Sequence, residues 1–314
     1  MRGVLVVNPK ATTTSPAVTD VLVGALSSEL ELDVIMTTHQ GHAFSIGEHA
    51  RASRLDIVVT LGGDGTVHEV VNGMLAAGPG EELPLLATVP GGSGNVFARA
   101  CGLPNDAVEA AGQILGAMRA GRSTAIGLGK CEAAELSAPV WFVANAGVGL
   151  DAEIIAAMDA KRVHGKSATP ARYLSVTLRE LLTKTNRKDP ALTILREHYE
   201  PIEHVFLAII QNTSPWTYFG PLPLNPCPAA SFDTGLDVFA VRNLRLHTAA
   251  FAARRLLMSS KAGSSRSAIR VLHDQSRFTI VTNRPIDVQL DGEGVGSLTK
   301  LEFSSYQQAI RVVV

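Results

Sequence analysis

The chain has 314 residues, of which 46% are hydrophobic and 18% charged, and its formal net charge is −1. This length is enough for two domains with separate cores, and the balanced charge argues against a nucleic-acid-binding protein. Cys101, Cys131 and Cys227 match no metal-ligand spacing, which favours reduced thiols in a cytoplasmic protein. No apolar run reaches the roughly eighteen residues that span a bilayer. The chain enters a strand at Gly3, which predicts no signal peptide.

Strands and helices alternate over about the first 120 residues. The apolar segments that predict strands are 4–7, 32–37, 56–59 and 85–89. Helices are expected from the N-cap Ser15 with Pro16 at the first position, over 42–53, after each of two glycine turns, and over 105–120. Such alternation predicts a parallel sheet covered by helices on both faces.

The first glycine turn, residues 60–66 (TLGGDGT), joins a β-branched strand to a helix. Thr66 and Glu69 have the spacing of a capping box for that helix. A glycine turn that opens a helix presents backbone N–H groups and the positive end of the helix dipole, which suits a phosphate. Asp64 adds a carboxylate where a nucleotide-bound magnesium ion would use one. The Gly-Lys-Ser/Thr ending of a P-loop is missing, which excludes that class of NTPase.

A second glycine turn, residues 90–95 (PGGSGN), follows the next strand. Consecutive parallel strands end at the same edge of a sheet, where open α/β sheets bind their ligands. A single turn of this kind is about as often structural as functional. Two in tandem, the first with an acid, favour a nucleotide site.

After residue 122 the pattern consists mostly of strands. Strands are expected over 125–131, 140–145, 191–196, 205–211, 236–241, 278–282 and 286–290. Helices are expected over 152–160, 170–182 and 248–258. This pattern predicts a second, largely antiparallel β domain. The apolar run 310–314 is expected to return to the first domain as an edge strand, which makes that domain discontinuous.

These motifs, in their order, resemble the diacylglycerol kinase catalytic family, in particular soluble bacterial lipid kinases that also resemble sphingosine kinases. The central Gly62-Gly63-Asp64-Gly65-Thr66 is shared with NAD kinases and phosphofructokinases, and the ordered combination is more specific. The segments that carry the resemblance are 8–10 (NPK), 37–43 (TTHQGHA), 62–66 (GGDGT), 90–99 (PGGSGNVFAR), 145–152 (NAGVGLDA) and 291–293 (DGE).

The resemblance implies an α/β protein of two domains. A Rossmann-like, NAD-kinase/phosphofructokinase-like nucleotide domain with a parallel sheet would take residues 1–122 plus about 304–314. A mostly antiparallel, β-sandwich-like domain for the lipid substrate would take residues 123–303.

The resemblance also implies ATP and Mg²⁺ as cofactors and assigns roles to residues. Glu293 would be the general base, and Asp64 would hold the magnesium. By spacing alone, Glu293 is an exposed hairpin acid. Asp233 lies in a stretch that holds a structural magnesium in some members, with Thr234 where a second acid would stand. The implied nucleotide contacts are Asn8, Thr37, Gly62, Gly63, Asp64, Gly65, Thr66, Gly92, Ser93 and Asn95.

The predicted activity is transfer of the γ-phosphoryl group of ATP to a hydroxyl of diacylglycerol or a related long-chain lipid. We expect a cytoplasmic protein in peripheral contact with the inner face of the membrane, through basic stretches at 161–166 and 254–270 and an apolar stretch at 216–224. Two alternatives remain open: an NAD kinase, and a nucleotide-binding regulator without catalysis. A homodimer is also left open.

Overall fold

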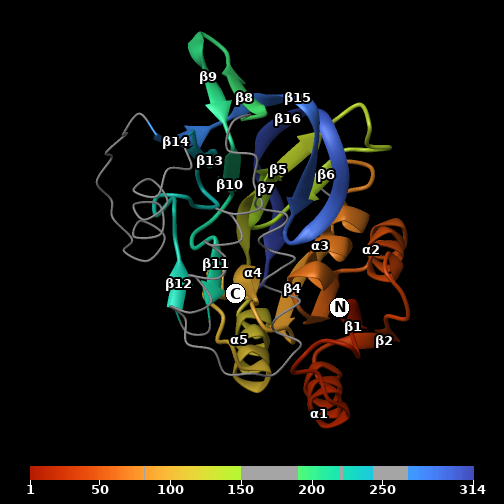
Figure 1. Ribbon diagram of the computed structural model, residues 1–314. Helices are drawn as coiled ribbons and strands as arrows, with labels where there is room; N and C mark the ends of the chain where they lie inside the picture. Colours follow the sequence, from red (N-terminus) through yellow and green to blue (C-terminus); the bar gives the residue numbers. More distant parts are fainter. Residues whose placement is uncertain (81, 150–189, 220–221, 243–267) are drawn as a thin grey trace. The chain divides into compact units, whose positions relative to one another are not determined.

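The computed structural model describes residues 1–80, 82–149, 190–219, 222–242 and 268–314. The chain divides into two compact units (Figure 1). Unit 1 comprises Met1–Leu128 and Tyr306–Val314, and unit 2 comprises Gly129–Ser305. From the sequence, the boundaries between the two domains are expected at residues 122–123 and at about residue 304.

Unit 1 contains a parallel sheet in the strand order β2-β1-β3-β4. Its strands are β1 (Arg2–Val7), β2 (Glu31–Met36), β3 (Ile57–Gly62) and β4 (Leu85–Pro90). The end of the long strand β16 (Glu293–Val312) pairs in parallel with β4, where Val312 lies opposite Leu86. The expected return of the C-terminal run to this sheet is therefore confirmed.

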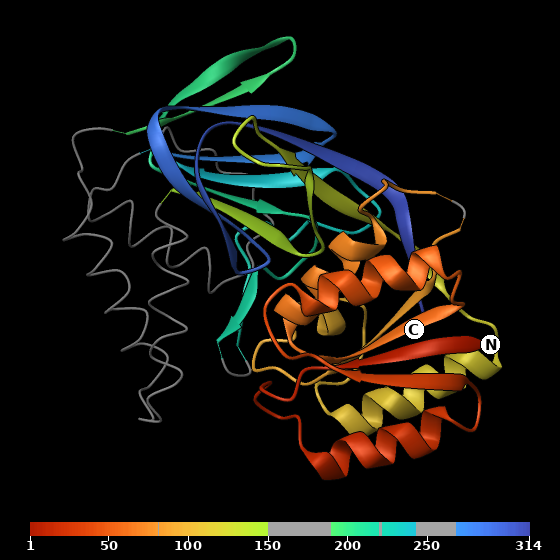
Figure 2. The ribbon, with the colours of Figure 1, turned by 90° about the vertical axis from the view of Figure 1, so that its right-hand side faces the viewer.

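Helices cover both faces of this sheet, as Figure 2 shows. One face packs against α1 and α5, and the other against α2 and α3, because the alternate side chains of each apolar strand point to opposite faces. The helices of unit 1 are α1 (Pro16–Leu26), α2 (His42–Ala52), α3 (Asp64–Met74), α4 (Val96–Ala100) and α5 (Ala107–Arg119). Ser15 caps α1, with Pro16 as its first residue, as predicted.

Unit 2 is mostly antiparallel, as predicted, with neighbouring strands in the order β14-β13-β10-β7-β15-β16. β5 (Thr124–Glu132) leads into this unit and pairs with β6, and β8 pairs with β15 and β9. β11 and β12 form a separate pair. The remaining strands are β6 (Val140–Phe142), β7 (Asn145–Gly149), β8 (Leu192–Arg196), β9 (Tyr199–Val205), β10 (Leu207–Gln211), β11 (Thr217–Phe219), β12 (Leu222–Leu224), β13 (Leu236–Val241), β14 (Ile269–Gln275) and β15 (Arg277–Leu290).

Three details of unit 2 differ from the sequence prediction. The strand expected over 140–145 is two strands, because the N–H groups of Val143 and Ala144 bond to the Asp291 carboxylate. The strands expected over 278–282 and 286–290 are one strand, β15, whose register shifts between Val281 and Ile286. β9, β11, β12 and β14 were not predicted.

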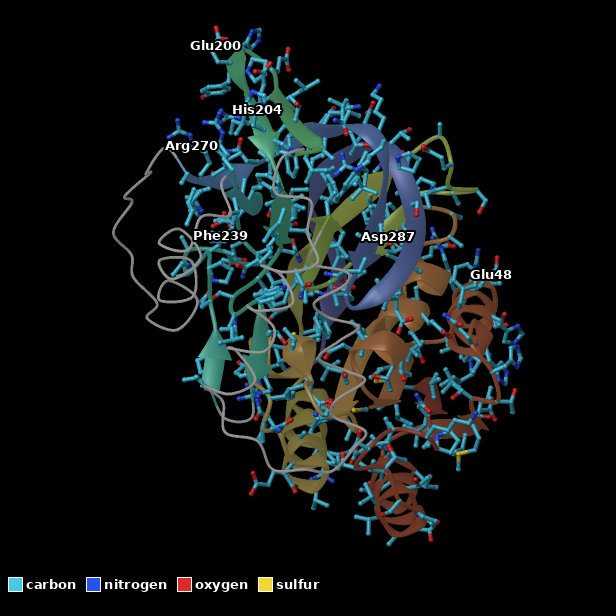
Figure 3. All side chains as sticks on the ribbon, viewed as in Figure 1. Glu48, Glu200, His204, Phe239, Arg270 and Asp287 are labelled. Carbon is cyan, nitrogen blue, oxygen red and sulfur yellow. The ribbon has the colours of Figure 1, made fainter. Side chains whose placement is uncertain are left out.

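Strand β15 organises the core of unit 2. Residues 279–282 pair with β8, whereas residues 288–290 pair with β7, and β16 pairs with β15 on its other edge. A long strand that changes partner across a register shift bends the sheet around one apolar core, which includes Phe142, Phe278 and Phe303. The β8–β9 hairpin projects from this core, with Glu200 and His204 pointing outward (Figure 3).

Candidate functional site

Three predicted contact positions lie at the ends of neighbouring strands in unit 1. Near the ends of β2, β1, β3 and β4, the strand register aligns one residue of each strand in a row, which consists of Met36, Val7, Leu61 and Val89. The next residue of each strand therefore lies at the same edge of the sheet. Those residues are Thr37, Asn8, Gly62 and Pro90. The strand order reverses between β1 and β3, and such a reversal is where open α/β sheets bind ligands.

The two glycine turns contact each other through their backbones. A Cβ atom on Gly92 would lie 2.6 Å from the Cα of Gly63, and one on Gly63 would lie 3.3 Å from the Cα of Gly92. The N–H of Gly91 donates to the carbonyl of Gly62 at 2.8 Å. Glycine is thus required at Gly92 for close approach. Gly63 itself has an extended backbone (φ −92°, ψ −173°).

The first turn opens α3 without a side-chain cap. Gly63 is the N-cap residue and Asp64 is the first helical residue. Thr66 is therefore inside the helix, and the predicted capping box is wrong. The Thr66 hydroxyl instead accepts a hydrogen bond from the Asn8 side-chain amide at 3.2 Å. Glycine at the N-cap leaves the start of α3 without a side-chain cap, which suits a phosphate.

Glu69 caps a neighbouring helix rather than its own. Its two carboxylate oxygens accept hydrogen bonds from the N–H of Gly41 at 2.9 Å and of Ala43 at 3.1 Å. Gly41, the N-cap residue of α2, has no side chain to serve this purpose and a φ of 84°. Glu69 thereby fixes the segment that follows Thr37. Sequence spacing alone could not identify this contact, because its partners are 26 and 28 residues away.

Asp64 connects the two glycine turns. Its Oδ1 accepts a hydrogen bond from the N–H of Phe97, in the first turn of α4, at 3.0 Å. The side chain is half-buried. A Cβ on Gly94 would lie 3.2 Å from its Oδ2. The carboxylate is thus held between the turns.

Asn95 holds the second turn in shape. Its backbone is left-handed (φ 48°, ψ 44°), and its buried amide exchanges hydrogen bonds with Gly92: Oδ1 accepts at 2.9 Å and Nδ2 donates at 2.7 Å. Nδ2 also donates to the Asn105 side chain at 2.8 Å. Asn tolerates the left-handed region better than other non-glycine residues. Ser93 is exposed at the tip of the turn.

In unit 2, the Asp-Gly-Glu motif forms a tight hairpin. Leu290 pairs with Glu293, and the two residues between them, Asp291 (φ 52°) and Gly292 (φ 90°), both have positive φ. This is a two-residue type I′ turn, for which Asp-Gly is a preferred sequence. Glu293 is therefore the first residue of β16 rather than part of the turn, and it is partly exposed.

Asp233, the implied position of a structural magnesium, lies in unit 2 among residues that the structure describes. Asp233 is exposed, and its N–H bonds to the Ser231 hydroxyl. The nearby buried Asp237 accepts hydrogen bonds from His273 at 2.7 Å and from the N–H of Asp274 at 3.0 Å. Burial raises the pKa of the Asp237 carboxyl, against the opposing effect of those hydrogen bonds. Within the described ranges, no group of three His, Cys, Asp or Glu side chains is arranged to hold a metal.

Two of the described cysteines, Cys101 and Cys131, are poor nucleophiles. All three are free thiols. Burial raises the pKa of the Cys101 and Cys131 thiols to about 12, so both stay protonated at neutral pH.

Part of the predicted lipid-facing surface lies outside the described residues. This applies to the helices expected over 152–160, 170–182 and 248–258 and to the basic residues Lys161, Arg162, Lys166, Arg254, Arg255, Lys261 and Arg266. Among the helices that the structure does describe, none is long and apolar enough to cross a bilayer.

The fold has close counterparts among solved structures. A diacylglycerol kinase from Bacillus anthracis str. Sterne superposes with a TM-score of 0.72 at 23% identity, over 99% of this chain and 96% of that one. An NAD kinase from Archaeoglobus fulgidus in complex with ATP superposes with a TM-score of 0.53 at 10% identity, over 99% and 93% of the two chains. The fold is therefore that of the two-domain α/β proteins typified by these kinases, as predicted.

Sequence comparison matches the N-terminal part of the chain to one family. Residues 2–131 match the diacylglycerol kinase catalytic domain. A diacylglycerol kinase of Bacillus subtilis (strain 168) is 39% identical over 80 residues, 25% of each chain. One of Staphylococcus aureus (strain JH9) is 35% identical over 111 residues, which are 35% of this chain and 33% of the relative. The predicted resemblance to the diacylglycerol kinase catalytic family is confirmed, and the matched segments span a quarter to a third of these curated relatives.

Proposed function

We propose that this protein is an ATP-dependent lipid kinase that phosphorylates a hydroxyl of diacylglycerol or a similar long-chain lipid. The observation that carries the proposal is the pair of glycine turns in unit 1, whose backbones touch at Gly63 and Gly92 at the carboxyl edge of a parallel sheet. This pair lies within the segment that matches the diacylglycerol kinase catalytic domain.

The proposed nucleotide site is built from backbone more than from side chains. The N-terminus of α3 has no side-chain cap, so its dipole and N–H groups would serve the phosphates. Asn8 and Thr37 follow the neighbouring strand ends. Asn8 is tied to Thr66 of α3, and Thr37 is held by its N–H bond to the Val7 carbonyl at 2.8 Å. These two residues would contact the nucleotide beside the phosphates.

The residues fit a nucleotide-bound magnesium ion rather than a site made by protein alone. Asp64 supplies one half-buried carboxylate, and the described residues include no cluster of three ligating side chains. Magnesium is commonly held in this way, by one or two carboxylates together with substrate phosphates and water. When bound, it would neutralise charge on the transferring phosphoryl group.

Glu293 is the proposed general base. It would accept the proton of the acceptor hydroxyl as that oxygen attacks the γ-phosphorus. Its place immediately after a rigid two-residue turn favours a fixed carboxylate, and its partial exposure leaves it accessible to an acceptor.

A turnover assay with several acceptors tests the proposal. ATP and magnesium are supplied with diacylglycerol or sphingosine in vesicles, or with NAD in solution. We expect phosphorylation of a long-chain lipid and none of NAD. The rate should rise with anionic lipid content and fall with salt, since each basic residue near an anionic surface contributes about 1 kcal/mol. Turnover of NAD at a rate indifferent to vesicles, with no activity on any lipid, would refute it.

A further inference from the structure

Buried polar side chains lie beneath the hairpin turn that precedes Glu293 in unit 2. Gln289 is 2% exposed, Asn145 7% and Asp291 8%. Burying an amide costs free energy unless its hydrogen-bonding groups find partners. An apolar core would avoid this cost, so the bonds that these three residues make need an account.

The two amides form a chain of hydrogen bonds with a defined direction. Gln289 Oε1 accepts from the N–H of Gly292 at 2.6 Å, and Gln289 Nε2 donates to Asn145 Oδ1 at 3.3 Å. Asn145 Nδ2 then donates to the Trp216 carbonyl at 3.0 Å. The backbone groups at the two ends fix how each amide is oriented, because an N–H can only donate and a carbonyl can only accept.

A second set of bonds anchors the same turn. The Asp291 carboxylate accepts from three successive N–H groups, of Val143 and Ala144 at 2.8 Å each and of Asn145 at 3.1 Å. The Asn145 carbonyl accepts from the N–H of Asp291 at 2.8 Å. Asn145 therefore holds the turn through both its backbone and its side chain. Both residues of the turn are tied to β7 or β15, and Glu293 follows at once.

We propose that Gln289 and Asn145 are positioning residues that fix the carboxylate of Glu293 through the Asp291-Gly292 turn. This inference rests on the proposed function, in which Glu293 is the general base. Neither amide takes part in the chemistry. They lock the backbone of the turn, and a misplacement of the base by about 1 Å can cost on the order of 100-fold in rate.

The first test replaces Gln289 with Met, which keeps the volume and removes both hydrogen bonds. Gln211 is a matched control, because it is 0% exposed and also makes two bonds, to the Cys227 N–H and the Thr213 carbonyl. We expect Gln289→Met to lower kcat roughly 10- to 100-fold with little change in KM for ATP. Gln211→Met should lose stability to a similar degree and keep its kcat. Equal kcat values for the two variants would overturn the proposal.

A double-mutant cycle separates this inference from the proposed function. If Gln289 acts only through Glu293, then Gln289→Met in a Glu293→Gln background should cause no further loss. Additive losses would refute the positioning role. A Glu293→Gln variant with full activity would instead refute Glu293 as the base, whatever Gln289→Met does.

Hydrogen exchange at the Gly292 amide gives a readout without turnover. The N–H is bonded to Gln289, so its exchange should accelerate in Gln289→Met and not in Gln211→Met. Unchanged exchange would overturn the proposed anchoring. If Gln289→Met does not fold, Gln289→Glu is the second variant: it keeps an acceptor for Gly292 but loses the donor to Asn145, and a fall in kcat is again expected. Full activity in that variant would refute the role of Asn145.

Discussion

The contact between the glycine turns of unit 1 and the hairpin turn of unit 2 depend on opposite features. In unit 1, the absence of side chains lets Gly63 and Gly92 bring two backbone segments into contact. In unit 2, buried side chains of Gln289, Asn145 and Asp291 hold the turn before Glu293 by hydrogen bonds. The first arrangement is vulnerable to added atoms, and the second to lost donors or acceptors.

This difference suits the proposed roles. A site for phosphates needs exposed N–H groups and close approach, which bare backbone provides. A general base needs one carboxylate held in one place, which a satisfied polar network provides.

Asp64→Asn should cause the largest loss of activity. The amide oxygen can still accept the N–H of Phe97, so α4 should keep its cap and stability should change little. The charge that would hold magnesium is lost, and with it several kcal/mol of transition-state stabilisation, so the rate should fall at least as far as in Glu293→Gln. A magnesium titration of the rate checks this. Normal activity with a normal magnesium titration would show that Asp64 serves only as a helix cap.

Glu293→Gln should lower turnover by roughly 100- to 10,000-fold, because the amide keeps the shape but cannot accept the proton. ATP binding should be nearly unchanged. Glu197→Gln is a control, since Glu197 is an exposed acid in the two-residue hairpin turn between β8 and β9. Steady-state rates and calorimetric ATP binding measure both. A rate within about threefold of wild type would exclude Glu293 as the base.

Gly92→Ala should disturb the contact between the glycine turns. Its Cβ would lie 2.6 Å from the Cα of Gly63, so the backbone must shift. Overpacking of this kind costs about 1–3 kcal/mol, and we expect weaker ATP binding as well. Gly116→Ala on α5 is the control, because its Cβ meets nothing within 4 Å and alanine favours a helix. Unchanged ATP affinity in folded Gly92→Ala would mean that the contact does not shape the site.

Glu69→Ala should have the smallest effect, about 1 kcal/mol in the free energy of unfolding, as is typical of a lost helix cap. The variant removes the acceptor for the N–H groups at the start of α2. Glu48→Ala is the control, since Glu48 is exposed on the same helix (Figure 3). Urea unfolding of the two proteins compares them. Equal stability would show that the cap contributes nothing.

The sequence predicted the parts that depend on local pattern. The apolar strands, the Ser15-Pro16 helix start and the two glycine turns follow from residue types and short spacings. The contacts across long separations could not be predicted in this way. Glu69 was assigned to its own helix, and the bonds from the Asp291 carboxylate to residues 143–145, which split an expected strand, span almost 150 residues. By contrast, Asp291-Gly292 is a preferred sequence for a two-residue hairpin, so this turn could have been predicted from the sequence.

A crystal structure with a non-hydrolysable ATP analogue and magnesium is the most direct test of the proposed nucleotide site. We expect phosphate oxygens at about 2.7–3.2 Å from backbone N–H groups of residues 63–66 and 92–95. We also expect the Asp64 carboxylate at the magnesium, directly or through water. A nucleotide bound away from both glycine turns, or phosphates held mainly by side chains with Asp64 remote from the metal, would contradict it.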